Sequence, residues 1–220
     1  MIPKRIHQIW LGPRPLPGEF AEWSRTWRVK HPEWSYELWT DENLPPLVNR
    51  ELFDAVGRRV PEPSRYRLQA DLLRCELLVR FGGLYTDLDN ECLRPVDDLM
   101  ENQTFVVAME PVIDDHIPND FIAARINHPL LWDLIRVAPE RGALLERKFL
   151  EGGAYAASRV DMAGGHQLAQ LIETRRYSDV TVLPYQLIHP CRRWLDEGRL
   201  DYTGVAYVRN HLRPDLGWKS

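Results

Sequence analysis

Residues 63–89 read PSRYRLQADLLRCELLVRFGGLYTDLD, and this stretch decides the fold of the chain. The spacing of its apolar side chains predicts a long helix that ends at Phe81, where Gly82 and Gly83 form a C-terminal cap. The apolar run that begins at Leu84 and ends in acidic residues predicts a strand followed by a turn. A helix that leads directly into a buried strand is a unit of α/β folds.

The predicted helix has two apolar flanks with two polar stripes between them. One stripe consists of Arg65, Gln69, Glu76 and Arg80, and the other of Arg67, Asp71 and Arg74. Since both flanks are packed, the two stripes cannot both face solvent. We expect the first stripe to be the solvated one, which turns Asp71 and Arg74 inward. A buried charge needs a partner, so these two residues either form a salt bridge three positions apart or serve a function.

Two aspartates, Asp87 and Asp89, stand two positions apart at the end of the predicted strand. In extended backbone their carboxylates project from the same side, and hard oxygen ligands suit Mg²⁺ or Mn²⁺ better than Zn²⁺. The carboxyl end of a parallel strand is where open α/β sheets bind ligands. An ion held by one or two carboxylates completes its shell with water and substrate phosphate. The pattern indicates a phosphate or diphosphate substrate, and a solvated acidic turn is the alternative.

Short apolar segments alternate with amphipathic ones along the rest of the chain. Strands are predicted at 4–11, 36–39, 104–109, 180–183 and 205–208, and helices at 19–29, 48–58, 130–137 and 167–173. This alternation predicts an α/β fold with a mostly parallel central sheet flanked by helices, formed by residues 1–220 as a single domain. Residues 138–165 contain two glycine pairs and are compatible with either a helix or a loop.

Composition excludes several classes of protein. The 220 residues carry 28 Lys and Arg against 32 Asp and Glu, a formal net charge of −4, without the basic cluster that nucleic acid requires. No apolar run reaches the ~18 residues of a membrane span, and the first residues do not form a signal peptide. The cysteines, Cys75, Cys92 and Cys191, match no metal-binding spacing. We therefore expect a cytoplasmic protein with reduced thiols that binds no nucleic acid.

Six motifs follow one another in an order that is typical of one enzyme family. They are IPKRIHQIWLG (2–12), HPEWSYELW (31–39), ADLLRCELLVRFGGLYTDLDNECL (70–93), AGGHQLAQL (163–171), VLPYQLIHP (182–190) and NHLRPDLGW (210–218). Together they make the chain resemble the DXD-containing glycosyltransferases of the family 32 type, which include mannosyltransferases and capsular polysaccharide sugar transferases. The same core signature occurs in the large clostridial glucosylating toxins.

This resemblance implies a GT-A fold and the transfer of a hexose with retention of the anomeric configuration. The donor that it implies is a UDP- or GDP-linked nucleotide-diphospho-sugar, bound with a Mn²⁺ or Mg²⁺ ion. The acceptor is a glycan, a lipid-linked sugar or a protein. Because eukaryotic members carry a membrane anchor and this sequence shows none, we expect a bacterial-type cytoplasmic enzyme of polysaccharide biosynthesis. Peripheral association with the inner face of a membrane fits a lipid-linked acceptor.

Family positions assign donor contacts to residues of this chain. By resemblance, Ile9 and Trp10 bind the nucleobase, the ring by stacking and the backbone by hydrogen bonds. Asp71 holds donor hydroxyls and Arg74 reaches the donor near its diphosphate, which gives both inward charges a use. Asn119 matches a polar position that lines the sugar site, and we expect it to act with Asp71 and Arg74 in catalysis.

Further positions concern the metal and the diphosphate. By resemblance, Tyr85 contacts the donor, Asp87 contacts the ribose and the metal or its water, and Asp89 binds the metal directly. His211 matches a metal ligand, and Trp218 matches a residue whose indole donates to the β-phosphate.

The C-terminal motif departs from the family pattern. Members usually carry Ser immediately before the closing Trp, where this chain has Gly217, and the spacing from His211 to Trp218 is one residue longer. The match at Asp89 is closer than the match in this segment.

Cleavage of a glycosyl phosphate bond develops negative charge on the diphosphate and positive charge on the sugar ring. A divalent ion with Arg74 and the Trp218 indole would stabilise the first charge, and Asp71 the second. Front-face attack by the acceptor, with the departing phosphate taking its proton, needs no covalent nucleophile. A covalent route would use one of three other carboxylates, Glu110, Asp114 or Asp115.

Two other classes of function remain open. A phosphohydrolase would use Asp87 as its nucleophile, although Asn90 and Glu91 break the pattern of that class. A non-catalytic protein could keep the donor pocket, which Gly217 leaves open. Metal-dependent turnover of a donor distinguishes the enzyme from both.

Two histidines are assigned from their positions. His7 belongs to the first predicted strand, and we expect a hydrogen-bonded core residue there. His166 aligns with a family loop near the donor diphosphate or the acceptor, which makes it a candidate contact.

Overall fold

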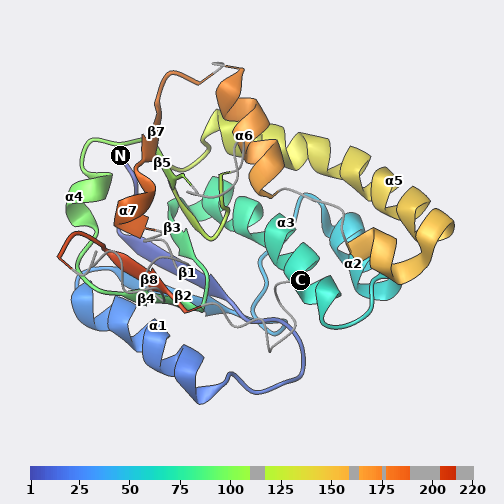
Figure 1. Cartoon of the computed structure of the whole chain (residues 1–220), viewed down its shortest axis with the longest axis horizontal. Coiled ribbons are helices and arrows are strands. Elements are labelled where there is room, and N and C mark those ends of the chain that lie inside the picture. The colour runs from blue at the N-terminus through green and yellow to red at the C-terminus, as the bar shows by residue number, and fades with distance from the viewer. Residues whose placement is uncertain (110–116, 159–163, 175–176, 189–203, 212–220) are drawn as a thin grey trace, which may run out of the picture.

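The computed structural model describes residues 1–109, 117–158, 164–174, 177–188 and 204–211, and in these residues a six-stranded sheet forms the centre of the fold (Figure 1). Its strands, in the order in which they lie side by side, are β2 (Ser35–Trp39), β1 (Arg5–Ile9), β3 (Gly83–Thr86), β6 (Phe121–Ala124), β5 (Phe105–Ala108) and β7 (Val180–Leu183). β1 runs parallel to β2 and β3, and β5 runs parallel to β7, whereas β6 is antiparallel to both of its neighbours. The predicted mostly parallel sheet is confirmed.

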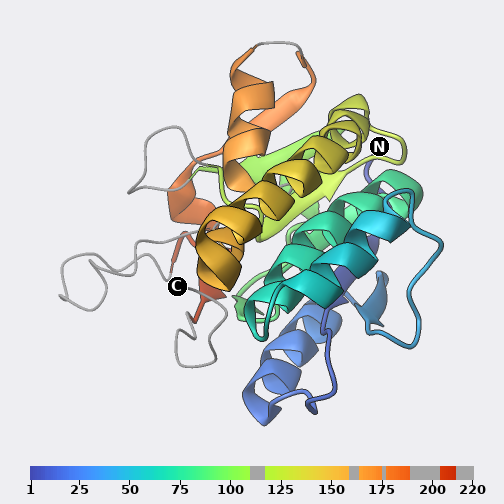
Figure 2. The ribbon, with the colours of Figure 1, turned by 90° about the vertical axis from the view of Figure 1, so that its right-hand side faces the viewer.

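Helices cover both faces of this sheet. On one face, α2 (Arg50–Arg59), α3 (Ser64–Phe81) and α5 (Pro129–Ser158) lie against one another, as Figure 2 shows. On the other face, α1 (Gly18–Lys30) packs on a small antiparallel sheet of β4 (Asn90–Cys92) and β8 (Val208–Asn210). The remaining helices are α4 (Asp97–Met100), α6 (Gly165–Glu173) and α7 (Tyr185–Ile188). No helix in the described ranges is long and apolar enough to cross a bilayer.

Alternate side chains of the strands enter two separate cores. In β3, Leu84 packs with the residues under α1, and Tyr85 packs with the residues under α3. Strands β5 and β6 alternate in the same way. Because successive side chains of a strand point to opposite faces, Tyr85 is directed towards α3, and the functional site depends on this direction.

A tight turn connects α3 to β3. The N–H of Gly82 donates to the carbonyl of Leu78 at 2.9 Å, and Gly82 adopts a φ of 60°, so the predicted glycine cap is confirmed. Gly83 has a φ of 98°, and a Cβ there would lie 2.4 Å from the carbonyl oxygen of Arg5. Only glycine tolerates this geometry without strain. The turn therefore brings β3 directly beside β1.

The solvated stripe predicted for α3 is wrong at its centre. Gln69 and Glu76 are buried, because α2 and the segment before it cover this side of the helix. The Gln69 amide donates to the Phe53 carbonyl at 3.1 Å, and the Glu76 carboxylate accepts from the N–H groups of Val48 and Asn49 at 2.9 and 2.8 Å. A carboxylate that satisfies the open N–H groups at the start of a helix has a structural reason to be buried.

The backbone at the acidic motif also differs from the prediction. β3 ends at Thr86, and the N–H of Asn90 donates to the Asp87 carbonyl at 3.1 Å, which closes a turn. The extended backbone expected at Asp87 and Asp89 is therefore wrong, and the strand period cannot be used to orient the two carboxylates.

Other elements also differ from the sequence analysis. Strands β4 and β6 and the short helices α4 and α7 have no counterpart among the predicted elements. Helix α5 runs well past the predicted end at residue 137, with an interruption at Gly153, where φ is 68°. The last predicted strand, 205–208, is found at Val208–Asn210.

Two of the three cysteines, Cys75 and Cys92, are buried in the cores as thiols. Burial raises the pKa of Cys92 to about 12, which keeps this thiol protonated. Cys191 lies outside the described residues.

His7 is a fully buried member of β1, as predicted. Its Nε2 lies 2.8 Å from the Gly82 carbonyl, and its Nδ1 accepts from the Trp39 indole at 3.0 Å. These two contacts specify a neutral ring with the proton on Nε2. Burial, with a smaller effect from Arg5, lowers the pKa of His7 to about 4 against the opposing hydrogen bond to Gly82.

We predict that His7 makes folding stability depend on pH between 6.5 and 4. The unfolded chain protonates this ring near its ordinary pKa of 6.5, whereas the folded protein resists protonation until about 4. The stability present above pH 6.5 is therefore lost as the pH falls, by about 3 kcal/mol for this group. Urea unfolding of wild type and His7→Gln across this range measures the effect. His7→Gln should lose less stability, and an exposed-site control, His166→Gln, should behave as wild type. Equal pH dependence in all three proteins contradicts the prediction.

Candidate functional site

Several segments that are distant in sequence end at one edge of the sheet. β1 and β3 are parallel, so the residues that follow them, Trp10 and Asp87, emerge at the same edge. β6 is antiparallel to β3 with Thr86 opposite Phe121, so the two residues just before β6, Asn119 and Asp120, reach this edge as well. The Asp87 N–H donates to the Asp120 carbonyl at 2.9 Å. This carboxyl edge is where open α/β sheets place their ligands.

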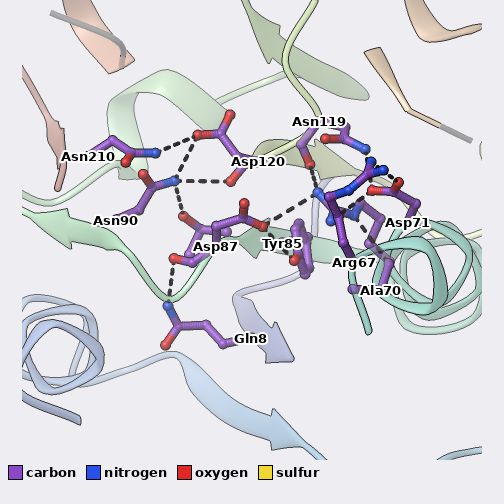
Figure 3. Close-up of polar contacts among 12 residues, drawn as sticks. Gln8, Arg67, Ala70, Asp71, Tyr85, Asp87, Asn90, Asn119, Asp120 and Asn210 are labelled. Atoms are coloured by element: carbon purple, nitrogen blue, oxygen red, sulfur yellow. Dashed lines mark hydrogen bonds and ion pairs between the residues drawn. The ribbon is translucent and has the colours of Figure 1, made fainter. Parts of the chain in front are cut away.

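The guanidinium of Arg74, which α3 directs towards the sheet, lies at the centre of the site. Its Nη2 is 3.1 Å from Asp71 Oδ1, its Nη1 is 3.4 Å from Asp87 Oδ1, and Nη1 donates to the Asn119 carbonyl at 2.5 Å. The Tyr85 ring lies beneath it, with the guanidinium carbon 4.5 Å from the ring centre. Figure 3 shows Asp71, Tyr85, Asp87 and Asn119, which come from different elements, gathered in one region.

Arg74 and Asp71 are each only 4% exposed, which confirms that both charges are turned inward. Burial would lower the pKa of Arg74, but Tyr85, Asp87 and Asp71 outweigh it and raise the pKa above the ordinary value. Burial also raises the pKa of the Tyr85 phenol. The site therefore contains a permanent cation, held by two carboxylates and by an aromatic face.

Asp71 is held from further sides. The Asn119 amide donates to Asp71 Oδ1 at 2.9 Å, and Arg67 Nη1 lies 3.6 Å from Asp71 Oδ2. Asn119 thus binds Asp71 through its side chain and Arg74 through its carbonyl. The three residues predicted to act in catalysis are brought together in one network.

The acidic turn is fixed mainly through its backbone. The buried Gln8 amide donates to the Asp87 carbonyl at 3.1 Å, and the Asp89 carbonyl accepts from the N–H of His211 at 2.8 Å. Leu88, between the two aspartates, packs in a cluster with Trp10. The Asp87 carboxylate accepts from the Tyr85 hydroxyl at 2.6 Å, and its side chain is 26% exposed.

Asp87 and Asp89 are the residues that could hold a divalent cation. They supply hard oxygen atoms from one turn, and this donor set fits Mg²⁺ or Mn²⁺. In the part of the chain that the structure describes, no group of three His, Cys, Asp or Glu side chains is arranged to hold an ion. An ion at this turn would take further ligands from water or from a substrate phosphate.

His211 lies beside this turn, because its backbone N–H donates to the Asp89 carbonyl at 2.8 Å. Its ring stacks on Trp23, with centroids 4.1 Å apart and planes within 6°, and its Nε2 lies 2.8 Å from Glu91 Oε2. Its role as a metal ligand stays a prediction. The other residues named for the C-terminal segment or for a covalent route, Gly217, Trp218, Glu110, Asp114 and Asp115, lie outside the described residues.

The two residues expected at the nucleobase are mostly buried. Ile9 belongs to the core under α3. The Trp10 ring packs on the edge of Phe20 and its indole donates to the Arg14 carbonyl at 2.7 Å, while its backbone N–H donates to the Trp39 carbonyl. Their contact with a base stays a prediction, as does that of His166, an exposed residue in α6.

Sequence reasoning missed four buried polar residues around the acidic turn, namely Gln8, Asn90, Asp120 and Asn210. Each stands next to a residue that was selected or in a motif that was quoted. The sequence did contain a signal for them, because a polar side chain within or next to a buried strand needs hydrogen-bond partners.

Comparisons with known proteins show that the chain is similar to glycosyltransferases. Residues 17–106 match a family model described as the glycosyltransferase sugar-binding region containing DXD motif. Inositol phosphoceramide mannosyltransferase 1 of Schizosaccharomyces pombe is 33% identical over 141 residues, which cover 61% of this chain and 42% of that protein. Initiation-specific alpha-1,6-mannosyltransferase of the same organism is 28% identical over 156 residues, which cover 61% of this chain and 39% of that protein. The chain thus matches less than half the length of these relatives.

Among solved structures, the PaToxG glycosyltransferase superimposes with a TM-score of 0.57 at 18% identity, covering 80% of this chain and 70% of that one. A likeness at this identity shows the fold, which is the GT-A fold.

We predict that removing the central cation destabilises the protein strongly. Arg74→Met leaves two carboxylates without their buried partner, which should lower the free energy of unfolding by about 3 to 5 kcal/mol. The matched control is Arg50→Met, which breaks an exposed pair with Asp54 at 3.0 Å on α2 and should cost less than about 1 kcal/mol. Denaturant unfolding of the two variants gives both values. Equal losses would mean that Arg74 is not the centre of the site.

Proposed function

We propose that this chain is a DXD-containing glycosyltransferase that transfers a hexose from a nucleotide-diphospho-sugar donor to an acceptor, on the strength of the family match over residues 17–106 and of the mannosyltransferase relatives. Mannose is the favoured sugar, since both curated relatives above are named as mannosyltransferases. The observation that carries the proposal is the acidic turn of Asp87 and Asp89 held against the buried Arg74 at the carboxyl edge of the sheet.

The metal fits this turn. Mn²⁺ or Mg²⁺, bound by Asp87 and Asp89, would offset negative charge on the departing diphosphate. The chain prepares the position by fixing the turn before any ligand arrives, through Gln8, Tyr85 and the backbone of Asp120. Donors and carboxylates that are already in place lose little free energy to reorganisation during the reaction.

Arg74 and Asp71 serve the sugar end of the donor in this proposal. Arg74, Arg67 and the Asn119 amide hold the Asp71 carboxylate in place, and a fixed carboxylate stabilises positive charge on a sugar ring. Arg74 stays charged at any physiological pH and holds Asp71 and Asp87 at a constant separation. Asn119 closes the site from the β6 side.

We extend the proposal to retention of the anomeric configuration, by front-face attack of the acceptor. The departing phosphate takes the acceptor proton, so the described residues need not provide a base. A glycosyl-enzyme adduct trapped on any side chain would contradict this part of the proposal.

For the donor base we keep both UDP and GDP, and for the acceptor a glycan or a lipid-linked sugar. One of the two relatives is named for an inositol phosphoceramide, a lipid, and the other for an α-1,6 linkage. A cytoplasmic location, with peripheral association to a membrane, stays a prediction on which the chemistry does not depend.

We predict metal-dependent turnover that requires Asp89. Wild-type protein is incubated with UDP- and GDP-linked hexoses, with and without Mn²⁺, and release of the nucleoside diphosphate is measured. One donor, expected to carry mannose, should be turned over only with Mn²⁺, and Asp89→Asn should lower kcat by about 100-fold or more. Asp54→Asn, which changes an aspartate on α2 outside the site, serves as the control and should keep wild-type kcat.

Turnover that is independent of Mn²⁺, or that survives in Asp89→Asn, would contradict the proposed site. Binding of a donor without any release of nucleoside diphosphate would instead favour a non-catalytic protein.

A further inference from the structure

A second cluster of buried polar side chains lies beside the site, as Figure 3 shows. It consists of Asp120, which is 8% exposed, with Asn90 and Asn210. The Asn210 amide donates to Asp120 Oδ2 at 3.0 Å. The Asn90 amide lies 3.4 Å from the same oxygen and donates to the Asp120 carbonyl at 3.1 Å. One carboxylate oxygen thus receives amides from two other segments.

Each member of the cluster lies in a segment that is hydrogen-bonded to the acidic turn. Asn90 closes the turn by donating its N–H to the Asp87 carbonyl, and the Asp120 carbonyl accepts the N–H of Asp87. Asn210 is the last residue of β8 and lies opposite Asn90 in the β4–β8 ladder. The next residue, His211, donates its N–H to the Asp89 carbonyl. The carboxylate of Asp120 therefore stands where β4, β6 and β8 meet.

The cluster also explains how a late segment reaches the metal turn. β8 is paired with the short strand β4 along three residues only, Asn90↔Asn210, Glu91↔Arg209 and Cys92↔Val208. A ladder of this length is marginal by itself. The bond from Asn210 to Asp120 ties the end of this ladder to the central sheet, at the point where the chain continues to His211.

We propose that Asp120 is a positioning residue that joins β8 to the acidic turn and so sets the place of His211 relative to Asp89. Asp120 itself touches neither sugar nor diphosphate in this proposal. The importance of Asp120 for catalysis rests on the proposed function. Its structural role, which is to join β8 to the acidic turn, does not depend on that function.

The test uses amide hydrogen exchange of His211, because its N–H is bonded to Asp89. Asp120→Ala should speed exchange at His211 by about tenfold or more, since the end of β8 opens more often. The matched control is Gln69→Ala, which removes a buried amide of similar exposure on the far side of α3 and should leave His211 exchange as in wild type. Unchanged exchange at His211 in Asp120→Ala would overturn the proposal.

If Asp120→Ala folds poorly, a second experiment tests the proposal by swapping the carboxylate and the amide between positions 120 and 210. The double variant Asp120→Asn with Asn210→Asp retains one amide and one carboxylate but reverses their places, so the two side chains can bond again. We expect Asn210→Asp alone to speed exchange at His211, because it sets two carboxylates against each other, and the double variant to restore slow exchange. Failure of the second change to restore it would contradict a direct link between the two positions.

A third measurement tests whether Asp120 affects metal binding. The Kd for Mn²⁺ in the presence of a nucleoside diphosphate should rise by about tenfold in Asp120→Ala and stay at the wild-type value in Gln69→Ala. An unchanged Kd with faster exchange would overturn the part of the proposal that concerns the metal. Wild-type protein that binds no Mn²⁺ would defeat the proposed function, while the exchange experiment would still decide whether Asp120 joins the segments.

Discussion

The burial of one guanidinium is the constraint on which the site depends. Arg74 comes from α3, and it contacts a helical carboxylate, the acidic turn after β3 and the loop before β6. These segments cannot separate without leaving a charge unpaired in the interior, which costs several kcal/mol. Two features of the fold make this burial possible. The glycine turn after Phe81 sets β3 beside β1, and the alternation of side chains along β3 directs Tyr85 towards α3.

Local features of the sequence predicted much of this arrangement. The helix to Phe81, its glycine cap and the inward direction of Asp71 and Arg74 follow from periodicity and from the cost of burying a charge. The acidic turn was recognised because it directly follows an apolar strand. The likeness to DXD-containing glycosyltransferases then added Asn119, which the structure brings within hydrogen-bond distance of Asp71.

The features that were missed depend on contacts between distant segments. Gln69 and Glu76 are buried because α2 covers them, and no pattern within α3 reveals the position of another helix. Strand β6 is a short apolar run that periodicity cannot distinguish from other buried segments. Its pairing with β3, which places Asp120 beside Asp87, therefore could not be predicted from the sequence. The acidic turn bends because Asn90 bonds back to Asp87, which an argument from extended backbone does not include.

The most direct test of the account is X-ray diffraction at the manganese absorption edge, from crystals grown with Mn²⁺ and a nucleoside diphosphate. The account predicts one anomalous peak at coordination distance from the Asp89 carboxylate, with diphosphate oxygens in the same shell and Arg74 still bonded to Asp71 and Asp87. A manganese peak away from the acidic turn, or an Arg74 side chain that has left both carboxylates, would contradict it.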